Sequence, residues 1–525
     1  FDAIDANVEV TAGRLTVAGE TARQVKLNLT IFDRAITFQD ASVLDFAGLA
    51  ASLAGTVSAK GGKPAFSIDH AIALHDPARF ARFSGASLLS SPARLGQVLS
   101  NGRLEGNLSR LKIDMRFKAI GATTRVHGAL SQPLANPSVD LQVSLKHPEL
   151  ATFIQKFSPD YRPAARKLGP LSLNTAVRGN AATLTVDEID IKAGPVAVAG
   201  TIKADRAGKR RKINLNLKMS EVLLDLFLPP SPPLASTRQT RGRSESGGVR
   251  GTGTRDRRGV PAQRWSTAPI ALPIPTEIDT YARIEMAALT ISDISLKTPK
   301  VKAVIRNGRL AVESFTSSLF GGSISGNAVV QLSVKKGAAL TSELSAEKVD
   351  SRIAIKTLTG HDRVQGPLSV KVKIATEGDS EASLVSKLNG NASLSGQAQI
   401  LLTKSERNQI GAVSVGANFL AGLLGGKVRE LQRLAPLNQL MASLDQAFGR
   451  NPAQLSGDIR ITRGVLQTDN LKLSGKGNVA TTRATVDLPR WNLNSTTELV
   501  DDPHKKPLFT FSATGPIDAP SKTRV

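Results

Sequence analysis

The stretch LSVKVKI, residues 368–374, shows the pattern that decides the fold. Apolar side chains occur at every second position with Lys371 and Lys373 between them, which is typical of a β-strand with one buried and one solvated face. The same period recurs along most of the chain, so we expect strands throughout. The clearest apolar rows are Leu368, Val370, Val372 and Ile374; Leu141, Val143 and Leu145; and Ile213, Leu215 and Leu217.

Short turn sequences separate the predicted strands. Asn307-Gly308, Asn389-Gly390 and Arg463-Gly464 supply the positive φ angles that two-residue hairpin turns require. Hairpins join antiparallel neighbours, so the pattern predicts an all-β, antiparallel protein. It is unusually long for a single β-sandwich.

The composition limits the possible size and chemistry. The chain has 525 residues, too many for one compact core, so domains or repeats are expected. It has no cysteine, and therefore no disulfide, thiolate metal ligand or thiol nucleophile. The net charge of +24 is compatible with binding to nucleic acid, with binding to anionic lipid or with simple solubility, and composition alone does not choose among them.

A Pro-, Arg- and Gly-rich stretch interrupts the strands at residues 229–275. It contains eight arginines against two acidic residues and thus carries +6 of the net charge, which leaves +18 for the solvated strand faces. Such a composition cannot bury enough apolar area to offset chain entropy, so we predict a disordered linker. Base stacking would need more aromatics than Trp265, so no nucleic-acid partner is expected. The linker separates an N-terminal β-repeat unit, 1–228, from a C-terminal β-domain, 276–525.

A second interruption, residues 405–448, has helical periodicity. Its spacing predicts an amphipathic helical insert that caps a sheet edge, because unpaired edges invite aggregation; contact with a membrane surface is the alternative. Residues 408–426 have the length of a transmembrane helix but contain too many glycine and polar residues to favour one. The apolar residues of the predicted helix are Val428, Leu431, Leu434, Leu437, Leu440 and Leu444.

The sequence also repeats itself at an offset of about 270 residues. The segments that begin at Val25 and at Val301 both read as strand, tight turn, strand, short apolar loop and a strand ending in small residues. A third, partial copy begins at Asp458. The two halves that flank the linker are therefore predicted to be related units.

Three stretches resemble the AsmA family of bacterial envelope proteins: NGRLAVESFTSSLFGGSISG (307–326), LNGNASLSG (388–396) and SGDIRITRGVLQTDNLKLSGKGNV (456–479). Arg463 stands where the family often has Asn or Asp. The similarity covers both halves and is stronger over residues 265–489. The family-like turn motif comprises Gly308, Leu310, Phe320, Gly321, Gly322 and Gly326.

The resemblance implies a long, repetitive, antiparallel curled sheet that forms a groove, similar to TamB-like and bridge-like lipid-transfer proteins, with the short helical insert near its C-terminal end. It implies a periplasmic body held at the bacterial inner membrane by an N-terminal anchor that would precede Phe1. The partners it implies are phospholipid or another envelope lipid, and outer-membrane assembly proteins.

The apolar rows allow two interpretations. The residues alone favour sandwich cores, whereas the resemblance favours a groove in which a phospholipid keeps its acyl chains away from water. We predict a periplasmic protein of outer-membrane biogenesis that carries or conducts phospholipid between membranes. The alternative is a non-enzymatic scaffold or chaperone-like factor for outer-membrane protein assembly.

No catalytic motif is found in the sequence. His70 and His75 are five residues apart, which fits no zinc spacing. After Gly426 and Lys427, Val428 stands where a phosphate loop needs Ser or Thr. No G-x-S-x-G is present. We therefore predict no enzyme, no catalytic residues, no cofactor and no metal site.

Overall fold

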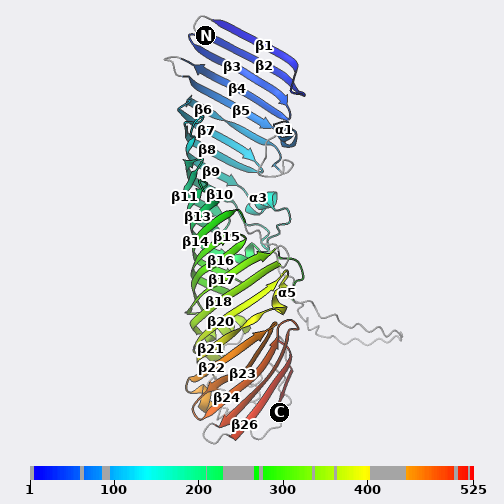
Figure 1. The fold of residues 1–525 in the computed structure, drawn as a ribbon, viewed down its shortest axis with the longest axis vertical. Helices are drawn as coiled ribbons and strands as arrows, with labels where there is room; N and C mark the ends of the chain where they lie inside the picture. Colours follow the sequence, from blue (N-terminus) through cyan, green and yellow to red (C-terminus); the bar gives the residue numbers. More distant parts are fainter. Residues whose placement is uncertain are drawn as a thin grey trace, which may run out of the picture. The chain divides into compact units, whose positions relative to one another are not determined.

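The computed structural model describes residues 5–59, 64–84, 95–208, 210–228, 265–270, 276–333, 337–359, 363–401, 445–501, 506–517 and 521–524. Its strands form one open, mixed sheet of 27 strands with a few short helices (Figure 1), which confirms the mostly β prediction. The chain divides into two compact units, each described by itself: Phe1–Leu228 with Pro273–Val329, and Pro229–Leu272 with Val330–Val525.

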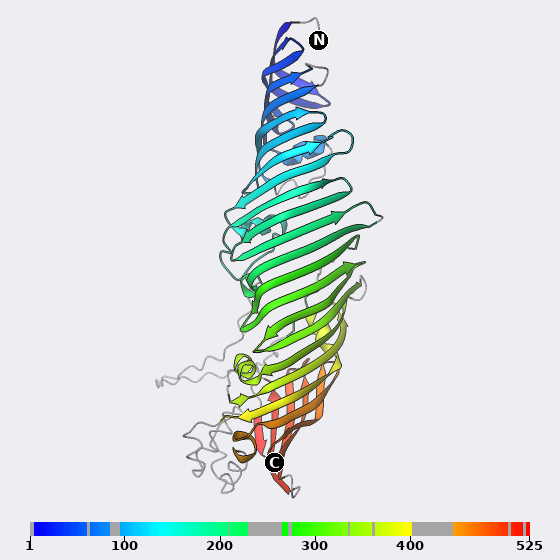
Figure 2. The same cartoon turned by 90° about the vertical axis from the view of Figure 1, so that its left-hand side faces the viewer.

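The strands of the first unit follow one another in chain order (Figure 2). Each strand from β1 to β13 pairs antiparallel with the next. These strands are β1 (Ala6–Val17), β2 (Glu20–Phe32), β3 (Ala35–Phe46), β4 (Leu49–Ser58), β5 (Ala65–Leu74), β6 (Val98–Asn107), β7 (Arg110–Ala119), β8 (Ala122–Ser131), β9 (Ser138–His147), β10 (Leu171–Asn180), β11 (Thr183–Ala193), β12 (Val196–Asp205) and β13 (Arg211–Leu223).

The sheet is mixed because β13 pairs parallel with β14 (Ile278–Ile291), which corrects the purely antiparallel expectation. Parallel neighbours need a long crossover connection, and residues 229–275, predicted as a linker between domains, supply it. Antiparallel pairing resumes from β14 to β15 and from β15 to β16. The remaining strands of this part are β15 (Ile294–Arg306), β16 (Arg309–Leu319) and β17 (Gly322–Ser333), and the boundary between the units falls inside β17.

The second unit is antiparallel wherever its pairings are described. Two short helices, α4 (Ser351–Thr359) and α5 (Glu381–Ser386), and a π-helical turn, η4 (Asp445–Gly449), join its strands. The strands are β18 (Gly337–Asp350), β19 (Val364–Gln365), β20 (Pro367–Gly378), β21 (Asn389–Ile400), β22 (Ala453–Thr462), β23 (Val465–Ser474), β24 (Asn478–Asp487), β25 (Asn492–Asp501), β26 (Lys506–Pro516) and β27 (Ser521–Arg524).

The predicted internal repeat is visible in the turns. Asp33-Arg34 joins β2 to β3, and Asn307-Gly308 joins β15 to β16; all four residues have φ between 47° and 70°. Two consecutive positive φ angles define a type I′ turn, whose twist matches that of the flanking strands. Each hairpin also has a register shift with one extra residue in its second strand, Gln39 in β3 and Glu313 in β16. The turn and the bulge therefore recur together.

Glycines with positive φ mark alternate strands of the first unit. Gly128 in β8 has φ of 146°, and a Cβ built on it would lie 2.1 Å from the carbonyl oxygen of Asp140 in β9. Only glycine allows the neighbouring backbone to come so close, a feature of sharply bent sheets. Four other strands carry such a glycine, with φ between 142° and 151°: Gly55, Gly106, Gly179 and Gly200.

Part of the predicted linker is held by defined contacts, which differs from the expectation of disorder. Within the second unit, the indole of Trp265 packs edge-on against that of Trp491 at 5.9 Å and donates to the carbonyl of Leu488 at 2.8 Å. The amide of Ser266 donates to a carboxylate oxygen of Glu381, and that of Ile270 to a backbone carbonyl. Residues 229–264 and 271–275 lie outside the described part of the chain.

Candidate functional site: an uncovered apolar sheet face

Strand β7 shows how the sequence creates two unlike faces. Its exposure alternates strictly along ten residues, so apolar and charged side chains lie on opposite sides. The apolar side chains are half-buried and the charged ones exposed. The first group is Leu111, Ile113, Met115 and Phe117, and the second is Arg110, Lys112, Asp114, Arg116 and Lys118.

Strand register extends the half-buried face of β7 across the first unit. Directly paired residues share a face of a sheet, so the pairings trace one row over ten adjacent strands, from β1 to β10. Only His70 and Thr175 interrupt its run of apolar residues and glycine. The row is Val10, Leu27, Ala41, Leu53, His70, Gly102, Met115, Val126, Val143 and Thr175.

The predicted row of β9 lies on this face. Val143 is in the transverse row itself, and Leu141 and Leu145 are its neighbours at period two, both half-buried. Leu145 pairs with Leu173 of β10, which pairs with Ile191 of β11. The face therefore continues beyond β10.

The predicted row of β13 occupies the equivalent face further along the same unit. Ile213, Leu215 and Leu217 are half-buried, and the residues between them are exposed. Leu217 pairs with Gly200 on one side and with Ile284 of β14 on the other, and the apolar run continues through Val301.

In the second unit the predicted row Leu368, Val370, Val372 and Ile374 lies on β20, with exposed Lys371 and Lys373 on the other face. Val372 pairs with Leu344 of β18 and with Ala392 of β21. This face therefore has the same construction as that of the first unit.

Little of the described part of the chain covers these faces. All described strands belong to the one sheet, so no second sheet within the described residues forms a sandwich with it. Three residues in the rows remain widely exposed, Val10 at 47%, Leu53 at 42% and Leu344 at 37%. The buried apolar residues of the described part are mostly alanines. The described rows are thus a partly exposed surface, and not the interior that the sandwich interpretation requires.

Coverage is local where it occurs. In the first unit, α3 (Leu150–Phe157) and the 3₁₀ turn η2 (Leu224–Leu226) surround a small cluster of Leu150, Ala151 and Leu168 at one edge of the sheet. In the second unit, η4 places Phe448, only 1% exposed, against Leu499. Each cluster caps strand ends and leaves the central rows open.

The opposite face carries ion pairs between neighbouring strands. Arg103 holds Asp69 through two hydrogen bonds of 2.8 and 2.7 Å, and Arg125 holds Asp114 through two of 3.1 and 2.9 Å. These guanidinium hydrogen bonds keep the pKa of both carboxyl groups below their usual range. The charged side chains therefore lie mainly on one face of the sheet, and the apolar face contains few ionic groups.

The histidines do not form a metal site in the described residues, which contain no group of three or more His, Cys, Asp or Glu side chains able to hold an ion. His70 is 8% exposed, and its Nε2 lies 3.0 Å from the hydroxyl of Ser100. His75 instead contacts Gln97 through Nδ1 at 2.9 Å. The two side chains thus have separate partners.

The family-like motif consists of turns and strands rather than a binding site. Gly308 follows Asn307 in one type I′ turn, and Phe320 and Gly321 form another, with φ of 47° and 78°. Leu310 lies on β16, where it pairs with Ile305. Gly322 and Gly326 belong to β17.

The predicted amphipathic helix lies outside the described residues, as do 408–426. The end of the predicted insert is described as η4. In the described part of the chain, no helix is both long and apolar enough to cross a membrane.

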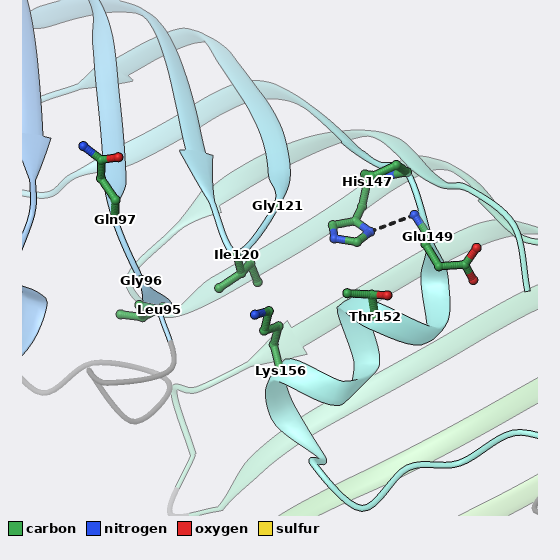
Figure 3. A pocket seen from close by; sticks show the side chains of 10 residues that line it. Leu95, Gly96, Gln97, Ile120, Gly121, His147, Glu149, Thr152 and Lys156 are labelled. Atoms are coloured by element: carbon green, nitrogen blue, oxygen red, sulfur yellow. Dashed lines mark hydrogen bonds between the residues drawn. The ribbon is translucent and has the colours of Figure 1, made fainter. Parts of the chain in front are cut away.

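The sequence reasoning missed how the β9 row ends. At period two, Leu141, Val143 and Leu145 are followed by His147, which is 5% exposed. Beside it lies a cavity of about 450 Å³, bordered by α3 and by the turn between β7 and β8 (Figure 3). Continuing the alternation by one step would have pointed to His147, whereas the cavity depends on where α3 packs.

The fold and these faces define a class: a β-protein built on one open sheet with an apolar and a charged side. Residues 162–398 match the model of the AsmA family, which confirms the resemblance found in the sequence. No curated protein and no solved structure matches the chain. This match supports, at a coarse level, a role in the cell envelope related to outer-membrane assembly.

Proposed function

We propose that this chain is a non-enzymatic periplasmic protein, attached to the inner membrane, that carries phospholipid along its apolar sheet face during outer-membrane biogenesis. The observation that carries this proposal is the apolar row traced through ten adjacent strands, partly exposed and without a covering sheet in the described part. The family match supports the envelope setting.

The energetics of acyl chains suit such a face. Removing a CH₂ group from water contributes about 0.8 kcal/mol, and aliphatic contacts are non-directional. A chain laid on Leu141, Val143 and Leu145 therefore gains stability at every position without being fixed to one. The polar headgroup then lies at the rim of the face, away from the apolar row.

Site-specific photocrosslinking tests this function. A photoreactive residue at Val143 or at Val372 lies on the apolar face, whereas the same residue at Ser144 or Lys373 lies one position along on the charged face. Expressed in cells with the natural membranes, the two apolar positions should crosslink to phospholipid, and their neighbours should not.

Other outcomes would count against the proposal. Crosslinks from Val143 and Val372 to outer-membrane barrel proteins would favour the scaffold alternative. Equal lipid labelling at all four positions would show that the apolar face has no special role.

A further inference from the structure

The cavity beside His147 lies where the β9 row reaches the edge of the first unit. Ile120 and Gly121, in the turn between β7 and β8, form one wall, and residues 95–97 before β6 form another. The N-terminal half of α3 and Lys156 close the third side (Figure 3). Its volume is about 450 Å³, enough for a polar headgroup but small for a whole lipid.

His147 presents a fixed donor to this space. Its Nδ1 accepts the backbone N–H of Glu149 at 3.0 Å, so the ring proton is on Nε2. The ring is 5% exposed and packs against Phe153 at 5.4 Å, which sets its orientation. A Cβ on Gly121 would lie 2.8 Å from Nε2, so the glycine leaves the N–H accessible. No described residue accepts from it.

Lys156 supplies the charge. It lies in the last turn of α3, and its ammonium group extends toward Ile120, on the cavity wall opposite the helix (Figure 3). No described carboxylate forms an ion pair with it. The one acidic residue of the lining, Glu149, accepts from the amides of Leu168 at 2.8 Å and Gly169 at 3.2 Å. Its carboxylate points away from Lys156 in Figure 3.

We infer that this cavity binds the anionic phosphate headgroup of a phospholipid whose acyl chains lie on the β9 row; the inference rests on the proposed function. Lysine is a common point-charge ligand of phosphate, and the Nε2–H of His147 adds a directed hydrogen bond. From His147 to Leu141 the strand rises over six residues, about 20 Å. One leaflet of a bilayer core is about 15 Å thick, so the row is long enough for an acyl chain.

The test compares two lysines that differ in the face they occupy. Lys156→Gln removes the charge at the cavity, and Lys146→Gln removes the same charge from the exposed face of β9. The full chain is incubated with vesicles of equal parts phosphatidylglycerol and phosphatidylcholine and re-isolated, and the bound lipids are measured by mass spectrometry.

The wild-type chain should be enriched in phosphatidylglycerol. Lys156→Gln should lower the ratio of the two bound lipids about five- to tenfold while total lipid stays constant, and Lys156→Arg should restore it. Lys146→Gln should leave the ratio unchanged, because this lysine lies away from the cavity. A general attraction to anionic vesicles would instead respond to the loss of either lysine.

Each failure has a distinct meaning. If no variant retains lipid, the proposed function itself fails. If both lipids are retained equally and Lys156→Gln changes nothing, lipid carriage stands and the headgroup site is refuted. If the chain binds glycerol 3-phosphate through Lys156 but shows no lipid preference, the site is one for a soluble phosphate ester and the inference is wrong.

Discussion

Replacing Gly128 by alanine tests whether close strand contacts shape the apolar face. Gly128 lies on that face, paired with Ile113 of β7 and Leu141 of β9. Its φ of 146° belongs to a region that is essentially restricted to glycine. The added Cβ would lie 2.1 Å from the carbonyl oxygen of Asp140 and 2.8 Å from the Cα of Leu141, and both atoms are backbone that a rotamer change cannot move.

The expected destabilisation has two parts. Holding a non-glycine residue at this φ costs about 1–3 kcal/mol, and forcing packed atoms apart costs about 1–3 kcal/mol more. We expect Gly128→Ala to lower the free energy of unfolding by about 2–6 kcal/mol, which lowers the melting temperature of a unit of this size by about 3–10 °C.

Gly13→Ala is the matched control. A Cβ on Gly13 has no atom within 4 Å, and its φ is not positive. Reduced freedom of the unfolded chain should make this change neutral or stabilising by up to about 1 kcal/mol. The same chemical substitution is thus expected to have opposite signs at the two positions.

Thermal unfolding followed by circular dichroism gives the overall shift, and hydrogen exchange gives its location. Because a chain with two units need not unfold in one step, the local measurement decides. Faster exchange should be confined to the ladder between β8 and β9. Unchanged exchange there in Gly128→Ala, or an equal loss of stability in Gly13→Ala, would refute the reasoning.

Two further predictions concern side chains of the second unit, and the control for the first of them, Leu134, lies in the first unit. Phe448→Ala should lower the free energy of unfolding by about 3–5 kcal/mol, because this ring is 1% exposed and packs against Leu499. Leu134→Ala, at a side chain 79% exposed, should change it by less than about 0.5 kcal/mol. Thermal melts distinguish the two variants, and equal shifts would contradict the packing argument. Trp265→Ala should release residues 265–270, measured as faster exchange of the Ser266 and Ile270 amides; unchanged exchange would show that the indole pair does not hold the segment.

The strands and turns could be predicted because their determinants are local. The alternation LSVKVKI is enough to assign two faces to β20, and Asn307-Gly308 is enough to place a hairpin turn. The repeat was visible for the same reason, since each copy contains its own turn and strand signals.

The parallel pairing of β13 with β14 could not be predicted in this way. Residues 229–275 have the composition of a linker, and composition does not report whether a chain returns to the same edge of a sheet. The contacts of Trp265 were also missed, because its partners Leu488 and Trp491 lie more than 200 residues away in sequence.

The candidate site, too, could be predicted from the sequence only in part. The sequence by itself determined that Leu141, Val143 and Leu145 share a face, since side-chain direction along a strand follows from the period of two. Only the tertiary structure decided that no second sheet of the described residues covers this face and that His147 and Lys156 border one cavity at its end. Covering and convergence depend on pairings between distant segments, which an amino-acid pattern alone does not specify.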